Sequence, residues 1–210
     1  MAEVRSRHIS FMAELVKAIE GGYKNMTRRL PKVQPTGEHL EHLERFSLGN
    51  FISRQDGFLY IAELNGSLTK TDFRSRYGKP GDLLWVKETW QTLGMGVVAY
   101  RADHGDDWEA YDMPEPCSEE LIQELRKGWK WKSPRYMPKW ASRRTLRIEK
   151  ICLERVQDIG EIDAYFEGCP PDWQGESYEW FEKVWRDING DKSWDENDWV
   201  EVISFEVVKE

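Results

Sequence analysis

HISFMAELVKAIEGGYKNMTRR, residues 8–29, contains a strand, a helix and a cationic motif in direct succession. The pattern predicts a short strand over 8–12, followed by apolar residues at helical spacing as far as Gly21 and Gly22. The residues that follow the helix include Lys24, Thr27, Arg28 and Arg29. The strand and the helix are therefore expected to deliver three cations and one hydroxyl to a single point of the fold.

The rest of the chain is expected to be rich in strands. Candidate strands cover 57–64, 81–90, 97–103, 145–156 and 199–208. Candidate helices cover 118–127, a short segment that ends at Gly168, and 177–188. Ser118 is expected to cap the first of these helices, and Asp158 with Glu161 resembles a capping box at the start of the second.

The order of these elements predicts the fold class. The chain shows no strand-helix-strand alternation and no glycine-rich phosphate loop, which argues against a doubly wound nucleotide-binding fold. We expect an α+β fold built on one mixed, barrel-like sheet that helices decorate. Residues 1–210 are expected to form a single domain, with insertions at about 30–56 and 104–128.

Composition limits the function classes. A formal net charge of -8 argues against a broad basic face that coats nucleic acid, so any such contact must be local. No apolar run approaches the ~20 residues of a membrane span, and the N-terminus lacks a secretory signal, so we expect a cytoplasmic protein without a membrane partner. The three cysteines and four histidines lack ligand spacing, so we expect neither a metal nor a cofactor.

The segment 129–145 combines aromatic and basic residues within this acidic chain. Such interleaving is expected where bases stack and phosphates meet cations. The alternative is a loop that closes over the barrel, with its tryptophans inward and its lysines in water. The candidate ligand-binding residues of this segment are Lys132, Arg135, Lys139, Trp140, Ser142 and Arg143.

A second candidate region is GDLLWVKETW, residues 81–90. Gly81 and Asp82 are expected to turn the chain into a strand. Trp85 is expected to pack in the core, and it is also one of the tryptophans beside charged residues that could line a ligand pocket. Glu88 has two interpretations: an ion pair with an arginine, for which Arg28 is a candidate, or recognition of the amino edge of a base.

Several separated segments together resemble the ASCH-domain proteins, a PUA-like β-barrel family, and in particular a phage and prophage subgroup. The segments are ISFMAELVKAIEGGYKNMTRR, GDLLWVKETW, YRAD, MPKWASRRTLRIEKICLERVQDI, DAYFEG and WVEVISFEV. The resemblance spans about His8 to Val207 and weakens over 30–75 and 104–128. It implies a PUA-like barrel and a function in recognising nucleobases or RNA.

The resemblance also implies a catalytic set. The family pattern after the first helix is Gly-x-Lys-Thr-x-Thr-Arg-Arg, and here Asn25 replaces the first threonine. One branch comprises small acetylcytidine amidohydrolases, whose lysine, threonine and glutamate correspond to Lys24, Thr27 and, through AYFEG, Glu167. A desolvated lysine can serve as base for a threonine nucleophile. Alternatively, Thr27 caps a turn while Lys24 and the arginines are solvated or bind carbonyl oxygens.

Three functions follow from these features. The first is a module that recognises a nucleobase, a nucleoside or single-stranded nucleic acid in a local cationic pocket containing Arg28 and Arg29. The second is an amidohydrolase that removes an acyl group from a modified cytidine. The third is a phage structural or host-interaction protein, because the apolar face with Trp180 and Trp185 could dock a protein partner. The choice between DNA and RNA, the occurrence of turnover and the oligomeric state stay open.

Overall fold

The computed structural model describes residues 4–32, 34, 51–53, 58–62, 68–94, 97–105 and 130–208. These residues form a mixed α+β fold, as the sequence predicts, but their strands are arranged in three sheets and not in the single barrel-like sheet that the sequence predicts. The predicted helix over 118–127 lies outside the described residues, and so do most of the two predicted insertions. None of the described helices is both long and apolar enough to cross a membrane.

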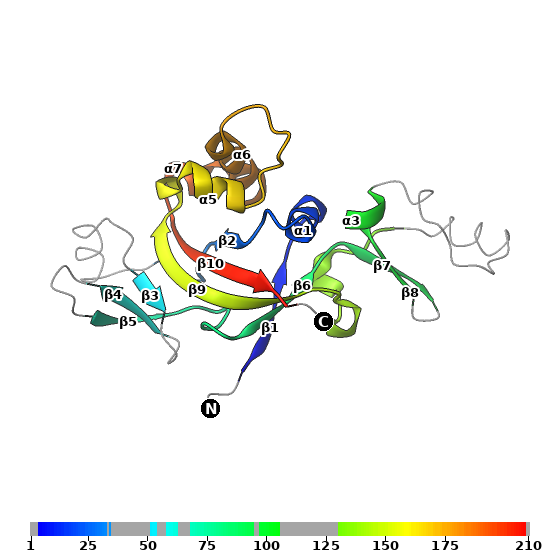
Figure 1. Ribbon diagram of the computed structural model, residues 1–210, viewed down its shortest axis with the longest axis horizontal. Helices are drawn as coiled ribbons and strands as arrows, with labels where there is room; N and C mark the ends of the chain where they lie inside the picture. The colour runs from blue at the N-terminus through cyan, green and yellow to red at the C-terminus, as the bar shows by residue number, and fades with distance from the viewer. Residues whose placement is uncertain are drawn as a thin grey trace.

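A curved five-stranded sheet forms the centre of the molecule (Figure 1). Its order is β1 (Ser6–Ser10), β6 (Leu83–Lys87), β9 (Thr145–Arg155), β10 (Trp199–Val207) and β2 (Met26–Arg29). β1 and β6 run parallel, whereas the other neighbours are antiparallel. The ladder of described strands is open, with β1 at one edge and β2 at the other.

A side chain connects these two edges. Arg29, the last residue of β2, donates a hydrogen bond from Nη2 to the carbonyl oxygen of Ser10, the last residue of β1, at 2.7 Å. We call the gap between β1 and β2 the seam of the sheet.

Two small sheets extend from opposite ends of the central one (Figure 1). One contains β3 (Phe51–Ser53), β4 (Phe58–Ala62) and β5 (Leu68–Arg74), and the other contains β7 (Trp90–Gly94) and β8 (Val97–Tyr100). The strand predicted over 81–90 is therefore divided between β6 and β7. The strand predicted over 97–103 ends at Tyr100, where the short helix α3 (Arg101–His104) begins.

Helices cover one face of the central sheet. Figure 1 shows α1 (Ala13–Glu20), α5 (Glu161–Phe166), α6 (Ser177–Asn189) and α7 (Asp191–Asp195) on the same side of β9 and β10. The core between these layers includes Val16, Ile151, Trp185 and Ile203, all of which are buried. Burial of this apolar surface is the main favourable contribution to folding.

Three short 3-10 helices complete the described structure: η2 (Pro134–Tyr136), η3 (Lys139–Ala141) and η4 (Val156–Asp158). The predicted capping box at Asp158 is wrong, because Asp158 lies in η4 and Gly160 precedes α5. The Glu161 carboxylate instead accepts hydrogen bonds from Ser177 N at 2.8 Å and Tyr178 N at 3.2 Å. It thereby caps the N-terminus of α6 and joins α5 to α6.

The expected partner-docking face of α6 is part of the core. Trp180 and Trp185 are 8% and 3% exposed and belong to the main apolar cluster. This face is therefore not available to a protein partner in this structure.

Candidate functional site

The end of α1 places Lys24 beneath the helix. Gly22 has a φ of +77°, a conformation that favours glycine, and the chain reverses so that Lys24 N donates to Ala18 O at 3.1 Å. Lys24 also forms an isolated antiparallel bridge with Glu167 at the end of α5. The backbone therefore brings together two members of the predicted catalytic set.

Lys24 is a buried ammonium with carboxylate and carbonyl partners. Its Nζ donates to Glu167 Oε2 at 3.0 Å, to Met26 O at 2.8 Å and to the carbonyl oxygen of Glu167. Burial lowers the pKa of Lys24 to about 8, although Glu167 acts in the opposite direction. A substantial fraction of this lysine is therefore neutral slightly above physiological pH.

Arg28 is held by three carboxylates. Its guanidinium donates to Glu154 at 2.6 Å, to Asp163 at 3.0 Å and to the second oxygen of Glu167 at 3.1 Å. The Arg28 side chain has no exposed surface. The predicted ligand-binding residue Arg28 is thus engaged inside the protein, where it links β2 to β9 and α5.

Thr27 and Glu167 line the same small cavity beneath α6, which we call the α6 cavity. Its other walls include Leu15 and the apolar side chains of Trp180 and Trp185. Thr27 is 3% exposed, so its side chain is almost fully buried at the wall of this cavity. The cavity volume of about 50 Å³ is well below the ≈ 300–1,000 Å³ of typical ligand sites.

A larger cavity lies along β1 at the seam, and we call it the β1 cavity. Its volume of about 580 Å³ falls within the range of small-molecule sites. Its lining consists of Ser6, Arg7, His8, Ile9, Ser10, Arg29, Arg76, Tyr77 and Trp85. Among the described residues, three arginines and no carboxylate line this space, in a chain whose net charge is -8.

Two of these arginines keep unused donors. Arg29 Nε and Arg7 Nη1 are buried and make no hydrogen bond to the described residues. Arg7 Nη1 lies 3.7 Å from Asp82 Oδ2, a long ion pair, and the Arg29 guanidinium lies 4.9 Å from the centroid of the Phe11 ring. Buried donors in proteins usually have a partner, either another protein group or ordered water, so these two N–H groups stand out.

Aromatic side chains border the same cavity. The rings of His8 and Trp85 have centroids 5.5 Å apart, and Arg76 donates to the Tyr77 hydroxyl at 2.6 Å. Burial lowers the pKa of His8, and the charges of Lys87 and Arg76 add to this effect. His8 is thus mainly neutral at pH 7 and can act as a donor or an acceptor.

The prediction that Trp85 packs in the core is wrong. Successive side chains of a strand point to opposite faces. Leu84 and Val86 of β6 are buried in the core, whereas the half-buried Trp85 lies on the other face and lines the β1 cavity. The prediction that Trp85 is a ligand-pocket residue fits its position.

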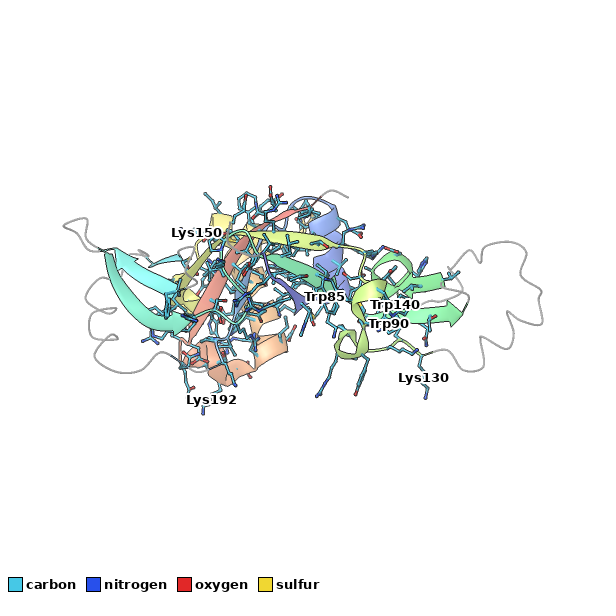
Figure 2. The ribbon with its side chains drawn as sticks, turned by 90° about the horizontal axis from the view of Figure 1, so that it is seen from below. Trp85, Trp90, Lys130, Trp140, Lys150 and Lys192 are labelled. Carbon is cyan, nitrogen blue, oxygen red and sulfur yellow. The ribbon has the colours of Figure 1, made fainter. Side chains whose placement is uncertain are left out.

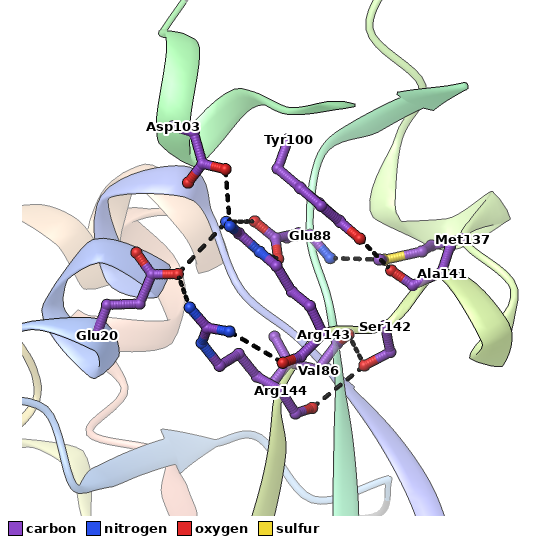
Figure 3. A network of polar contacts seen from close by, with 10 residues as sticks. All are labelled: Glu20, Val86, Glu88, Tyr100, Asp103, Met137, Ala141, Ser142, Arg143 and Arg144. Atoms are coloured by element: carbon purple, nitrogen blue, oxygen red, sulfur yellow. Dashed lines mark hydrogen bonds and ion pairs between the residues drawn. The ribbon is translucent and has the colours of Figure 1, made fainter. Parts of the chain in front are cut away.

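Glu88 forms the predicted ion pair, but its partner is Arg143 and not Arg28 (Figure 3). Arg143 donates from Nε and Nη2 to the two Glu88 oxygens at 2.9 and 3.0 Å, and from Nη1 to Asp103 at 2.7 Å. Its guanidinium also lies 4.0 Å from the centroid of the Tyr100 ring. Arg143 therefore anchors a structural network and is not free to bind a ligand.

The remaining candidates of the 129–145 segment divide into two groups. Ser142 is structural, because its hydroxyl donates to Val86 O at 2.9 Å. Lys132, Arg135, Lys139 and Trp140 are exposed. Trp140 contacts Trp90 edge to face, with ring centroids 6.2 Å apart.

Sequence reasoning missed much of the β1 cavity. It did not single out Arg7, His8, Arg76 or Tyr77, although SRHIS and RSRY place cations beside aromatic or imidazole rings. Among the described residues, no group of three or more His, Cys, Asp or Glu side chains is arranged to hold a metal ion.

Comparison with protein-family models, with curated proteins and with solved structures gave no match to this chain.

Proposed function

We propose that this protein binds an anionic ligand that carries a nucleobase, a nucleotide or part of a nucleic acid, in the β1 cavity. One observation carries the proposal: three arginines and Trp85 line a space of about 580 Å³, and no carboxylate in the described part of the chain lines it. The net charge of the chain is -8, so this positive charge is local.

The lining chemistry matches the two parts of a nucleotide. Guanidinium groups bind phosphate oxygens through paired, charge-assisted hydrogen bonds. Arg7 and Arg29 keep buried N–H groups without hydrogen-bond partners among the described residues, and Arg76 adds an exposed cation. The indole of Trp85 offers an aromatic surface to a base, because stacking on aromatic side chains is a general mode of base recognition.

We further propose that the curved sheet is a PUA-like barrel of the ASCH type. Support comes from the resemblance of the separated motifs and from the order of the strands, which places β1 and β2 at the two edges that a barrel would bring together. The Arg29 bond to Ser10 O spans these edges. In this proposal the ligand binds at the seam where the barrel closes.

Binding of nucleoside 5′-monophosphates, compared with the matched nucleosides, tests the proposal by calorimetry. We expect the monophosphates to bind more tightly, with an affinity that decreases as salt increases. Arg76→Gln should weaken monophosphate binding at least tenfold, since a hydrogen bond to a charged group contributes about 1.5–3 kcal/mol. Arg147→Gln is the matched control, because Arg147 is exposed and pairs with Glu206 outside the cavity.

Trp85→Ala should weaken binding of the base, by about 1–3 kcal/mol if a base stacks there. Absence of binding by any mononucleotide or oligonucleotide would refute the proposed function. Binding that neither Arg76→Gln nor Trp85→Ala changes would refute its location.

A second candidate function is the removal of an acyl group from a modified cytidine. The observation that favours it is the 3.0 Å contact between Lys24 Nζ and Glu167, which lines the α6 cavity together with Thr27. Neutral Lys24 would take the proton of Thr27 while Thr27 Oγ1 attacks the acyl carbon. The proton would pass to the leaving amine of the base, and water would then hydrolyse the threonine ester.

The α6 cavity of about 50 Å³ is too small for a nucleoside, so this reaction requires α6 to move. Incubation with N4-acetylcytidine and measurement of released acetate tests it. Acetate release that Thr27→Val and Lys24→Met abolish would establish the reaction. Release no greater than that of Lys24→Met would leave a protein that binds bases without turnover.

A further inference from the structure

The segment Lys130–Arg144, which we call the basic segment, contains six Lys or Arg residues and no Asp or Glu. It also carries the two most exposed aromatic side chains among the described residues, Tyr136 at 71% and Trp140 at 65%. Exposed apolar surface that is rimmed by polar residues is typical of interaction sites, and here both rings lie among basic residues of one short segment.

Tyr136 and Trp140 are held in exposed positions by buried neighbouring residues. They lie on two successive 3-10 turns, η2 and η3, and Met137 and Ala141 beside them are each 2% exposed. The Tyr100 hydroxyl donates to Ala141 O at 2.8 Å, which holds η3 against β8. The two exposed rings are therefore presented by a supported surface, which reduces the entropy lost on binding.

The basic segment is continuous with the β1 cavity through Lys87. The Nζ atom of Lys87 donates to Arg135 O at 2.7 Å, and it lies 5.4 Å from the centroid of the Trp85 ring. In Figure 2, Trp85 lies between the central sheet and the pair formed by Trp90 and Trp140, with Lys130 beyond them. A ligand that leaves the cavity past Trp85 thus meets η2 and then η3.

A ligand along this path would contact, in order, the cationic β1 cavity, the indole of Trp85, and the exposed rings of Tyr136 and Trp140. Lysines and arginines flank the two exposed rings. Single-stranded nucleic acid matches this order, because successive bases stack on aromatic side chains while cations follow the phosphates. A long duplex does not match, since its bases are stacked inside and its backbone needs a broad basic face that a chain of charge -8 lacks.

From this continuity we infer that the ligand is a single strand of several nucleotides, which places one nucleotide in the β1 cavity and its neighbours across Tyr136 and Trp140. This inference rests on the proposed function, because it extends the ligand of the β1 cavity. Contacts with the basic segment make the affinity increase with the length of the strand, whereas the cavity alone binds a single nucleotide.

Fluorescence anisotropy with single-stranded DNA and RNA of 1, 2, 4 and 8 nucleotides tests the inference. Affinity should increase with length up to about four nucleotides and then level off. Tyr136→Ala with Trp140→Ala should weaken binding of the 8-mer at least tenfold, consistent with about 1–3 kcal/mol per stacked base. The same double variant should leave mononucleotide binding unchanged.

Two control variants match the side chains removed. Tyr165→Ala removes an exposed aromatic ring from α5, and it should not affect the 8-mer. Lys139→Gln should weaken binding of the 8-mer and reduce its salt dependence, whereas Lys192→Gln on α7 should do neither, since Lys192 lies far from Trp140 in Figure 2.

The outcomes separate this inference from the proposed function. Binding of mononucleotides, together with 8-mer binding that the double variant does not weaken, would overturn the inference and leave the proposed function intact. Absence of binding by every length would overturn both. A decaglutamate peptide should compete poorly with the labelled 8-mer. If it displaces the labelled 8-mer at the same concentration as unlabelled 8-mer does, the inference would be overturned, because the surface would then be a site for acidic peptides.

Discussion

Glu167 places one carboxylate oxygen 3.0 Å from Lys24 Nζ and the other 3.1 Å from Arg28 Nη1. One buried carboxylate thus contacts two buried cations, and it cannot be removed without leaving both with one partner fewer.

Glu167→Gln should lower the free energy of unfolding by about 3–5 kcal/mol, the usual effect of removing one partner from a buried ion pair. Urea unfolding at pH 7 measures it. Glu206→Gln is the control, because the pair that Glu206 forms with Arg147 is about half exposed and should contribute less than about 1 kcal/mol. Equal losses in the two variants would contradict the structural role of Glu167.

The lowered pKa of Lys24 should make the folded protein more stable at alkaline pH. Its pKa is about 8 in the folded protein against 10.5 for the free side chain, so between these values the unfolded chain binds more protons. The free energy of unfolding should therefore rise with pH across this window, by about 3 kcal/mol in total. Cys152 acts in the opposite direction, because burial raises its pKa from 9.0 to about 11.

The contribution of Lys24 is isolated by subtracting the stability of Lys24→Met at each pH. The difference between wild type and variant should change in favour of wild type from pH 8 to pH 10.5. A difference that stays constant would show that Lys24 titrates normally.

The raised pKa of Glu201 should give the free energy of unfolding a second dependence on pH, with the opposite slope. This β10 carboxylate is 1% exposed and accepts a hydrogen bond from the Ser75 hydroxyl, and burial raises its pKa from 4.5 to about 7. Between pH 4.5 and 7 the folded protein binds more protons than the unfolded chain, so its stability should fall as pH rises. Glu201→Gln should lack this fall of about 3 kcal/mol in chemical unfolding.

Arg143→Lys should destabilise the protein by about 2–3 kcal/mol. A lysine cannot reproduce the two-pronged contact with Glu88, whose carboxylate is 1% exposed and would lose a hydrogen bond. Arg144→Lys is the control, since the Arg144 side chain is 33% exposed and its partner Glu20 is 26% exposed. The midpoint temperature of thermal unfolding should be clearly lower for Arg143→Lys than for Arg144→Lys.

The sequence predicts the long strands well. Alternation over 145–156 corresponds to β9, Thr145–Arg155, and the pattern over 199–208 corresponds to β10, Trp199–Val207. β9 has one face in the core, so its apolar residues recur with a period of two on either side of a register shift. β10 is instead buried on both faces over 199–203, and it is recognised by its run of apolar residues. The parallel pairing of β1 with β6 was not predicted, because it joins segments with no local pattern in common.

Ionic partners were the least predictable part of the site. The sequence around Arg28 does not indicate which carboxylate is its partner. Its pairing with Glu154, Asp163 and Glu167, and not with Glu88, depends on which elements are neighbours in the fold. The meeting of Lys24 with Glu167 was expected through the family resemblance alone. The β1 cavity was missed for the same reason, since its walls come from segments around residues 8, 29, 76 and 85.

Lys24 and Glu167 are separated by 143 positions in the chain. At about 5–20 residues per second, roughly 7 to 30 seconds pass on the ribosome between synthesis of the lysine and synthesis of its carboxylate partner. Glu154 and Asp163, the other partners of Arg28, are made in the same late interval. Because neither cation can be buried alone without a large penalty, β2 must stay hydrated while most of the chain is translated, and it docks only after α5 and β10 have emerged.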